Sequence, residues 1–283
     1  MKLPKFEYAA PRTLDEAIEL LASRSGAKAL AGGQSLIPTM AFRLAAPPLL
    51  VDLGKVAGLE RMELGKDFTV LGARVRWRDI LDSHQLKRSQ PLLAAAIEHV
   101  AHYQIRNRGT VGGSLAHADP AAELPGIAVT CDAEIHVRGK AGARRVSADE
   151  FFVGPLSTVL GDDELIVEVR FPAWPAGRRW GFQELSPRRG DFAYAGIAAF
   201  YDLDADGRAC NAHIGVIGAC PRPHRIPEAE SALNGRMVDA GVIREAAAAA
   251  ENAVDPPGDL HASAAYRRSL VGTLLERALG RES

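Results

Sequence analysis

Two stretches with adjacent glycines constrain this chain more than any other feature. The first reads Ala31-Gly32-Gly33-Gln34-Ser35 and the second reads Thr110-Val111-Gly112-Gly113-Ser114. Glycine lacks a Cβ, so the backbone can turn sharply and approach a bulky ligand. Successive exposed N–H groups in a bend form an anion nest, and hydroxyl groups suit phosphate oxygens. The pair predicts two walls of one groove around a diphosphate. Two tight turns between secondary-structure elements are the simpler alternative.

The overall composition is that of a globular protein without a strong charge. The 283 residues are 47% hydrophobic and 24% charged, with a formal net charge of -1. This length allows two domains, and the charge gives no reason to expect binding to nucleic acid. No run approaches the ~18 apolar residues of a membrane span, and the N-terminus lacks a signal-peptide pattern. We therefore expect a cytoplasmic protein without a membrane span.

The cysteine and histidine residues, which are common metal ligands, show no spacing that is typical of a metal site. Cys131, Cys210 and Cys220 lie far apart and form no C-x-x-C motif, which argues against a disulfide framework, a zinc site or an iron–sulfur cluster on this chain. His99 and His102 would be three residues apart on one helix, but no third ligand has suitable spacing. Neither a G-x-G-x-x-G motif nor a catalytic serine motif is present, so we expect no metal and no catalytic residue.

The pattern of elements is that of an α+β chain. Residues 1–55 read as strand, helix, strand, loop and strand, with a capping box formed by Thr13 and Glu16 before the helix. Residues 56–177 read as a second α+β unit that ends in a linker containing proline and glycine. Residues 178–283 read as a C-terminal α+β domain with strands first and two helices last.

Two arginines stand just before the second glycine stretch. Arg106 and Arg108 could bind a phosphate or a carboxylate through their guanidinium groups. A solvated helix end explains the same residues about equally well. The residues alone leave both interpretations open.

Four motifs in order resemble those of a known family. Together they are similar to the FAD-binding medium subunit of molybdenum hydroxylases, which includes the medium subunit of carbon monoxide dehydrogenase and the flavin subunit of bacterial xanthine dehydrogenases. The similarity runs from Phe6 to the final helix, and four motifs are far more specific than one loop. The motifs are Ala31-Gly32-Gly33-Gln34-Ser35-Leu36-Ile37-Pro38, Gln104-Ile105-Arg106-Asn107-Arg108-Gly109-Thr110-Val111-Gly112-Gly113-Ser114, His117-Ala118-Asp119-Pro120-Ala121-Ala122-Glu123 and Arg189-Gly190-Asp191-Phe192-Ala193.

The resemblance implies a fold and a cofactor. FAD would lie between two N-terminal α+β subdomains of the vanillyl-alcohol oxidase type, 1–55 and 56–177, and the C-terminal domain would cover the flavin. The diphosphate and the ribityl chain would contact the two glycine stretches and their neighbours. These residues are Ala29, Leu30, Ala31, Gly32, Gly33, Gln34, Ser35 and Leu36, followed by Thr110, Val111, Gly112, Gly113 and Ser114.

The resemblance also places single residues near the cofactor. Glu123 would be an acid near FAD, and the motif before it contributes Ala118 and Asp119. Ile166 would make a backbone contact to the flavin, and Val100 would approach the ring. The residues expected where the C-terminal domain meets the isoalloxazine are Asp191, Phe192 and Tyr194, and an aromatic side chain there could stack on the ring. Gln183 stands where the xanthine-oxidising branch has a lysine, which argues against NAD as acceptor.

The resemblance implies an electron-transfer role. A large subunit with molybdopterin would oxidise the substrate, and a small subunit with two [2Fe–2S] clusters would pass the electrons on. FAD on this chain would collect them for an external acceptor: quinone, cytochrome, oxygen or NAD. The subunits would form a dimer of heterotrimers, with attachment to the inner face of the membrane through the complex as one option. The alternatives are a self-sufficient flavin-dependent oxidoreductase and a flavin-free assembly subunit.

Overall fold

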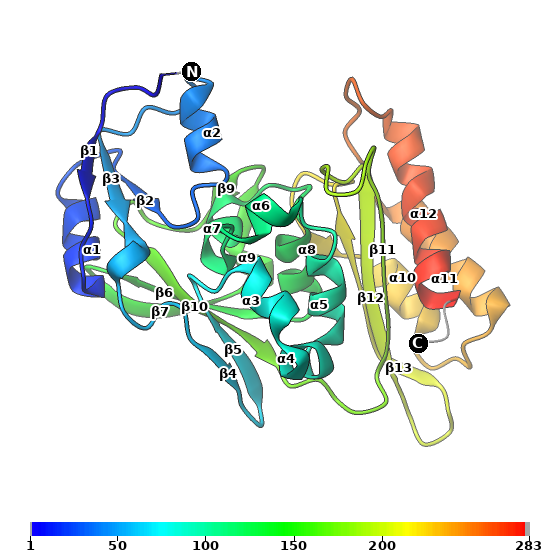
Figure 1. Ribbon diagram of the computed structural model, residues 1–283. Coiled ribbons are helices and arrows are strands. Elements are labelled where there is room, and N and C mark those ends of the chain that lie inside the picture. Colours follow the sequence, from blue (N-terminus) through cyan, green and yellow to red (C-terminus); the bar gives the residue numbers. More distant parts are fainter. Residues whose placement is uncertain (1, 281–283) are drawn as a thin grey trace.

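The first unit of the fold is a small parallel sheet with one long helix beside it (Figure 1). The computed structural model describes residues 2–280, and the three strands of this sheet run in the order β1-β3-β2. The expected capping box is confirmed, because the Thr13 hydroxyl accepts from Glu16 N–H while the Glu16 carboxylate accepts from Thr13 N–H. The elements are β1 (Glu7–Ala9), α1 (Leu14–Ala22), β2 (Lys28–Leu30), α2 (Leu36–Ala41), β3 (Leu49–Asp52) and a 3-10 turn at Leu53–Lys55.

The second unit is an antiparallel sheet of five strands with short helices packed on it. The strand order is β4-β5-β10-β6-β7, so β10, the last of these strands in sequence, pairs with both β5 and β6 in the middle. Its strands are β4 (Met62–Leu64), β5 (Phe68–Gly72), β6 (Glu134–Gly139), β7 (Gly142–Ser147) and β10 (Leu165–Pro172), beside a separate pair, β8 (Phe152–Gly154) and β9 (Ser157–Thr158). Its helices are α3 (Trp77–Asp82), α4 (His84–Ser89), α5 (Pro91–Ile97), α6 (Tyr103–Arg106), α7 (Val111–His117), α8 (Glu123–Thr130) and α9 (Ala148–Phe151).

The third unit is an antiparallel sheet that separates two hydrophobic cores. Phe182 and Phe200 belong to the core of the second unit, whereas Ile197 and Val216 pack with the C-terminal helices. Alternation of side chains along each strand therefore turns one face toward α5 and α8 and the other toward the last helices (Figure 1). The elements are β11 (Arg179–Leu185), β12 (Ala195–Leu203), β13 (Ala209–Ile217), β14 (His224–Arg225), α10 (Pro227–Leu233), α11 (Ala240–Ala253) and α12 (Ala264–Gly280).

Helix α8 lies very close to this sheet because glycines line the contact. A Cβ on Gly215 would stand 1.9 Å from the Thr130 hydroxyl oxygen, and one on Gly126 would stand 2.3 Å from Cγ1 of Ile217. Larger residues at these positions would force the helix away from the strands. The close approach brings polar groups of the two units together.

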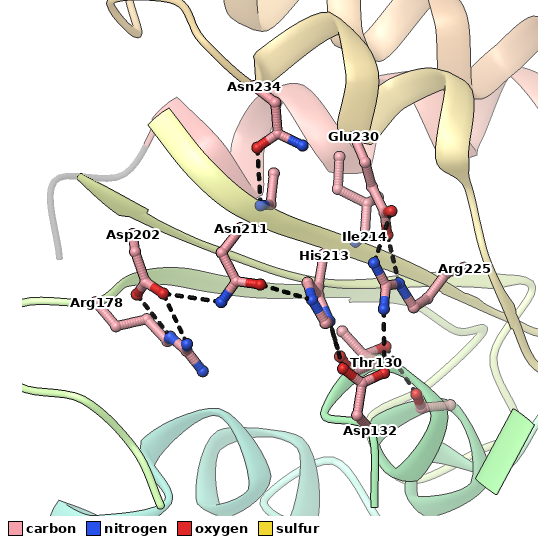
Figure 2. Close-up of polar contacts among 12 residues, drawn as sticks. Thr130, Asp132, Arg178, Asp202, Asn211, His213, Ile214, Arg225, Glu230 and Asn234 are labelled. Carbon is pink, nitrogen blue, oxygen red and sulfur yellow. Dashed lines mark hydrogen bonds and ion pairs between the residues drawn. The ribbon is translucent and has the colours of Figure 1, made fainter. Parts of the chain in front are cut away.

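A chain of polar side chains crosses this contact (Figure 2). Nδ1 of His213 donates to the Thr130 carbonyl oxygen at 2.9 Å, and Nε2 lies 3.2 Å from Oδ1 of Asn211. The amide of Asn211 donates to Asp202, which also accepts two hydrogen bonds from Arg178. The C-terminal sheet is thus attached to the second unit by hydrogen bonds as well as by apolar packing.

Two expectations about local structure are wrong. The second glycine stretch is the first turn of helix α7 and not an open bend. His99 and His102 do not share a helix, because α5 ends at Ile97 and α6 begins at Tyr103. No cluster of three or more potential metal ligands occurs among residues 2–280. In the same range, no helix combines the length and apolar character that crossing a membrane requires.

Candidate functional site

The first glycine stretch forms a loop with unpaired backbone donors between β2 and α2. Gly33 has a φ of +72°, which other residues rarely adopt. Within residues 2–280, the N–H groups of Gly32, Gly33, Gln34 and Ser35 donate to no protein acceptor, and the Ser35 hydroxyl makes no cap bond. Consecutive free N–H groups of this kind are an anion-binding nest. The expectation of a nest therefore agrees with the geometry of this loop.

The second glycine stretch lies at the start of α7, and its N–H groups are already used. Thr110 is the N-cap, and its hydroxyl accepts from Gly113 N–H at 3.2 Å. The remaining first-turn N–H groups, those of Val111, Gly112 and Ser114, donate to the carbonyl oxygens of Val75, Ala73 and Thr110. This stretch therefore offers a surface without bulky side chains, with Gly113 exposed, and not an anion nest.

The two glycine stretches touch, although they are far apart in sequence. A Cβ on Gly32 would lie 2.2 Å from the carbonyl oxygen of Arg108 and 3.0 Å from Cα of Gly109. A small solvent-open cleft lies where they meet. Its lining residues are Ala31, Gly32, Arg74, Arg76, Arg108 and Thr110. The two glycine stretches therefore meet at one groove, as expected, and three arginines are among its lining residues.

Arg106 and Arg108 have different roles. One nitrogen of Arg106, Nη1, donates to the carbonyl oxygens of Val100 and Ala101 at 2.8 Å each. Arg106 therefore fixes the segment before α6, where Ala101 has a φ of +41°. Arg108 is exposed and lines the cleft. The sequence left open whether these arginines bind an anion or lie at a solvated helix end. Arg108 is in a position to bind an anion, whereas Arg106 is used to hold the backbone.

A pair of carboxyl groups is buried where the C-terminal sheet faces the second unit. Glu123 begins α8, and burial raises its pKa to about 7. Glu184 lies on β11, where burial, reinforced by the Glu123 charge, raises the pKa of its carboxyl to about 8. Among residues 2–280, Oε2 of Glu184 has no hydrogen-bond partner, and Oε1 is 3.9 Å from Nδ1 of His99. The sequence analysis identified Glu123 but missed Glu184, which the alternation of side chains from Phe182 could have placed on this face.

Two of the C-terminal residues expected near the flavin, Gln183 and Tyr194, lie on the side of the C-terminal sheet that faces the last helices. Gln183 lies on the same face as Gly181, whose Cβ would be 2.1 Å from the Ala278 carbonyl oxygen of α12. Its side chain therefore points away from the second unit. Tyr194 packs with the C-terminal core, and its carbonyl oxygen accepts from Arg267 at 2.7 Å.

The loop between β11 and β12 reaches the segment that contains Val100. A Cβ on Gly190, which has a φ of +91°, would lie 2.5 Å from the carbonyl oxygen of Ala101. Asp191 and Phe192 follow on this loop and are exposed, Phe192 at 65%. An aromatic side chain is thus available to a ligand or a protein at the edge of the two units.

The remaining predicted residues are mostly built into secondary structure. Ile166 is buried on β10 and pairs with Val137 of β6. Ala118 ends α7 in the left-handed region with a φ of 52°, and the Asp119 carboxylate accepts from the N–H of Ala121. Ala29 and Leu30 form the end of β2, and Leu36 begins α2.

Comparison with known proteins places the whole chain in one family. The model for the FAD binding domain in molybdopterin dehydrogenase matches residues 4–174, and that for the CO dehydrogenase flavoprotein C-terminal domain matches residues 180–281. The chain belongs to the FAD-binding subunits of the molybdopterin dehydrogenase family, which are flavoprotein oxidoreductase subunits. This confirms the expected family, its two-part α+β fold and its FAD cofactor.

Individual relatives match from end to end. The nicotine 6-hydroxylase medium subunit of Paenarthrobacter nicotinovorans is 40% identical over 99% of this chain and 98% of its own length. Carbon monoxide dehydrogenase of Hydrogenophaga pseudoflava superposes with a TM-score of 0.95 at 36% identity, over 99% of this chain and 98% of that one. Quinoline 2-oxidoreductase of Pseudomonas putida 86 superposes with a TM-score of 0.94 at 37% identity, over 99% of this chain and 97% of that one.

Proposed function

We propose that this chain is the electron-transfer subunit of a heteromeric molybdenum hydroxylase. Bound FAD supplies the redox chemistry by taking up electrons and giving them to an external acceptor. The electrons come from [2Fe–2S] clusters on a small subunit, after a large molybdopterin subunit has oxidised the substrate. The subunits form a dimer of heterotrimers in the cytoplasm. The nicotine 6-hydroxylase relative is named a medium subunit, and this name supports the presence of a larger and a smaller partner subunit.

The contact between Gly32 and the backbone before α7 is the observation that carries this proposal. It places four free N–H groups beside a surface without bulky side chains, in a cleft lined by arginines. A diphosphate carries negative charge and many acceptor oxygens, so these donors fit it. We assign the diphosphate and ribityl chain to residues 29–36 and 110–114. The Thr110 and Ser114 hydroxyls and the exposed Gly113 face supply the second wall.

The rest of the flavin is assigned to the boundary between the units. Residues 1–177 hold the cofactor and residues 178–283 cover it. Glu123, Val100 and the Ile166 backbone approach it from the first part, with Ala118 and Asp119 shaping the turn between α7 and α8. Asp191, Phe192 and Tyr194 approach it from the second. Gln183 turns its side chain toward α12, so we assign it a backbone contact.

Purification of the native chain with its partners tests the proposal. We expect a yellow complex that releases one FAD per chain and contains a larger molybdenum protein and a smaller iron–sulfur protein. Reduction by the complex's substrate should bleach the flavin, and the acceptor that restores its colour identifies the physiological class. A colourless chain that ignores added FAD would favour an assembly subunit. A yellow chain that oxidises a substrate alone would favour a self-sufficient oxidoreductase.

A further inference from the structure

Three arginine residues line the cleft at the junction of the glycine stretches. Arg74, Arg76 and Arg108 all line it. Arg74 has one ion pair, at 3.4 Å from the exposed Glu60. In the described part of the chain, no carboxylate lies within 4.0 Å of Arg76 or Arg108. The cleft is therefore lined by three cationic residues, of which only Arg74 has an ion pair within the described residues.

The backbone holds these arginines in fixed positions around the cleft. Segment 73–77 is bonded to segment 109–112 through Gly112 N–H to Ala73 O at 2.8 Å, Val111 N–H to Val75 O at 3.0 Å and Trp77 N–H to Gly109 O at 3.3 Å. The Arg108 carbonyl oxygen is the atom on which Gly32 packs. The backbone of these arginines and the free N–H groups of the first glycine stretch therefore belong to one connected arrangement.

Arginines that line one cleft with few carboxylate partners favour the binding of an anion there. Guanidinium groups bind phosphate oxygens in a bidentate way, and a nest of N–H groups binds a second anionic group beside them. Two linked phosphates match this combination better than a single carboxylate, because they carry two charges and can meet both sets of donors at once.

We propose that Arg74, Arg76 and Arg108 bind the diphosphate of FAD and make the site selective for FAD over flavins with fewer phosphates. This inference rests on the proposed function, since it requires FAD in the groove. Arg74, which is the most buried of the three with a side chain 17% exposed, contacts the diphosphate from the floor of the cleft. Arg76 and Arg108 contact it from the solvent side.

Flavin binding by single and double variants tests this inference. The full chain, purified with its accompanying subunits and stripped of flavin, is titrated with FAD, FMN and riboflavin. Arg76→Gln and Arg108→Gln should each raise the Kd of FAD by about tenfold at low salt, and the double variant by more. The Kd of riboflavin, which has no phosphate, should not change. Raising the salt from about 50 to about 500 mM should weaken FAD binding more in the parent than in the double variant.

A matched control separates local from general charge effects. Arg88→Gln removes the same charge from an exposed position near the end of α4 that does not line the cleft, and should leave all three affinities unchanged. Equal FAD affinity in the parent and the double variant would overturn the inference while leaving FAD binding itself intact. An equal loss for riboflavin and FAD would overturn it too, because the arginines would then act on the fold. Failure of the parent to bind FAD at all would instead overturn the proposed function.

Discussion

The imidazole of His213 on β13 donates a 2.9 Å hydrogen bond to the carbonyl oxygen of Thr130, the last residue of α8. The same ring stacks on Phe200 with 4.4 Å between centroids. One side chain therefore joins the C-terminal sheet to the second unit through this hydrogen bond, while the stacking holds the ring against the neighbouring strand β12 of its own sheet. Both partners are buried, at 6% and 0% exposed, so the bond is shielded from competing water.

Removal of this side chain should loosen the contact between the units. We expect His213→Ala to lower the free energy of unfolding by about 2 kcal/mol or more, because it leaves the buried Thr130 carbonyl unpaired and removes a stacked ring. Urea unfolding of the flavin-free chain measures the change. His84→Ala, at an exposed position in α4, should change the stability by less than about 0.5 kcal/mol. Equal effects of the two substitutions would contradict the assignment.

The buried Glu184 carboxyl should make stability depend on pH. Its pKa in the folded chain, about 8, lies above that of an exposed glutamate, so the folded state holds a proton that the unfolded state has lost. The free energy of unfolding should therefore fall as the pH rises from about 4.5 to 8. Each unit of raised pKa corresponds to about 1.4 kcal/mol.

Substitution by glutamine isolates this effect. Glu184→Gln cannot ionise, so it should be more stable than the parent at pH 8 and should show a weaker pH dependence in urea unfolding. Glu123→Gln should do the same to a smaller extent, since its pKa reaches only about 7. A Glu184→Gln chain with the parent's full pH dependence would show that other groups cause it.

Gly32 should tolerate no side chain at all. The Cβ of Gly32→Ala would stand 2.2 Å from a backbone oxygen that cannot move alone, so the loop must shift away from residues 108–109. We expect loss of measurable FAD binding by the flavin-free chain. Gly154→Ala, where a Cβ meets no atom within 4 Å, should bind FAD as the parent does. Retained binding in Gly32→Ala would place the cofactor elsewhere.

Phe192 should influence the flavin without supporting the fold. Its side chain is 65% exposed, so Phe192→Ala should change the unfolding free energy by less than about 0.5 kcal/mol. If it covers the isoalloxazine, its loss should expose the flavin and increase fluorescence quenching by iodide. Leu203→Ala, also on the surface at 45% exposed, is the control and should leave quenching unchanged. Identical quenching in both variants would exclude Phe192 from the flavin environment.

Much of the fold could be predicted from local sequence signals. The structure confirms the capping box at Thr13 and Glu16 and the apolar strands before each turn. These features could be predicted because they depend on interactions between residues close together in the sequence. The bend with free donors at the first glycine stretch could also be predicted, because glycine adopts a left-handed conformation, such as the φ of +72° at Gly33, without steric cost.

The helical conformation of the second glycine stretch could not be predicted from the local sequence. Glycine disfavours helices by about 1 kcal/mol per residue, so two in a row indicate a turn. Here Thr110 caps the helix and Gly112 must pack on Ala73, where a Cβ would be 2.6 Å from that residue's own Cβ. Helix α7 is therefore a product of tertiary packing. Glu184 and Arg74 were missed for the same reason, since their partners lie on other strands and loops.

The contact between Gly190 and Ala101 has a wider consequence. Ala101 is held in its unusual conformation by Arg106, and two residues later Arg108 supplies the carbonyl on which Gly32 packs. A substitution at Gly190 would thus disturb the cleft between the glycine stretches through a series of backbone contacts, although Gly190 itself does not line that cleft. Sequence changes in the C-terminal domain can in this way reach the cleft between the glycine stretches without lining it.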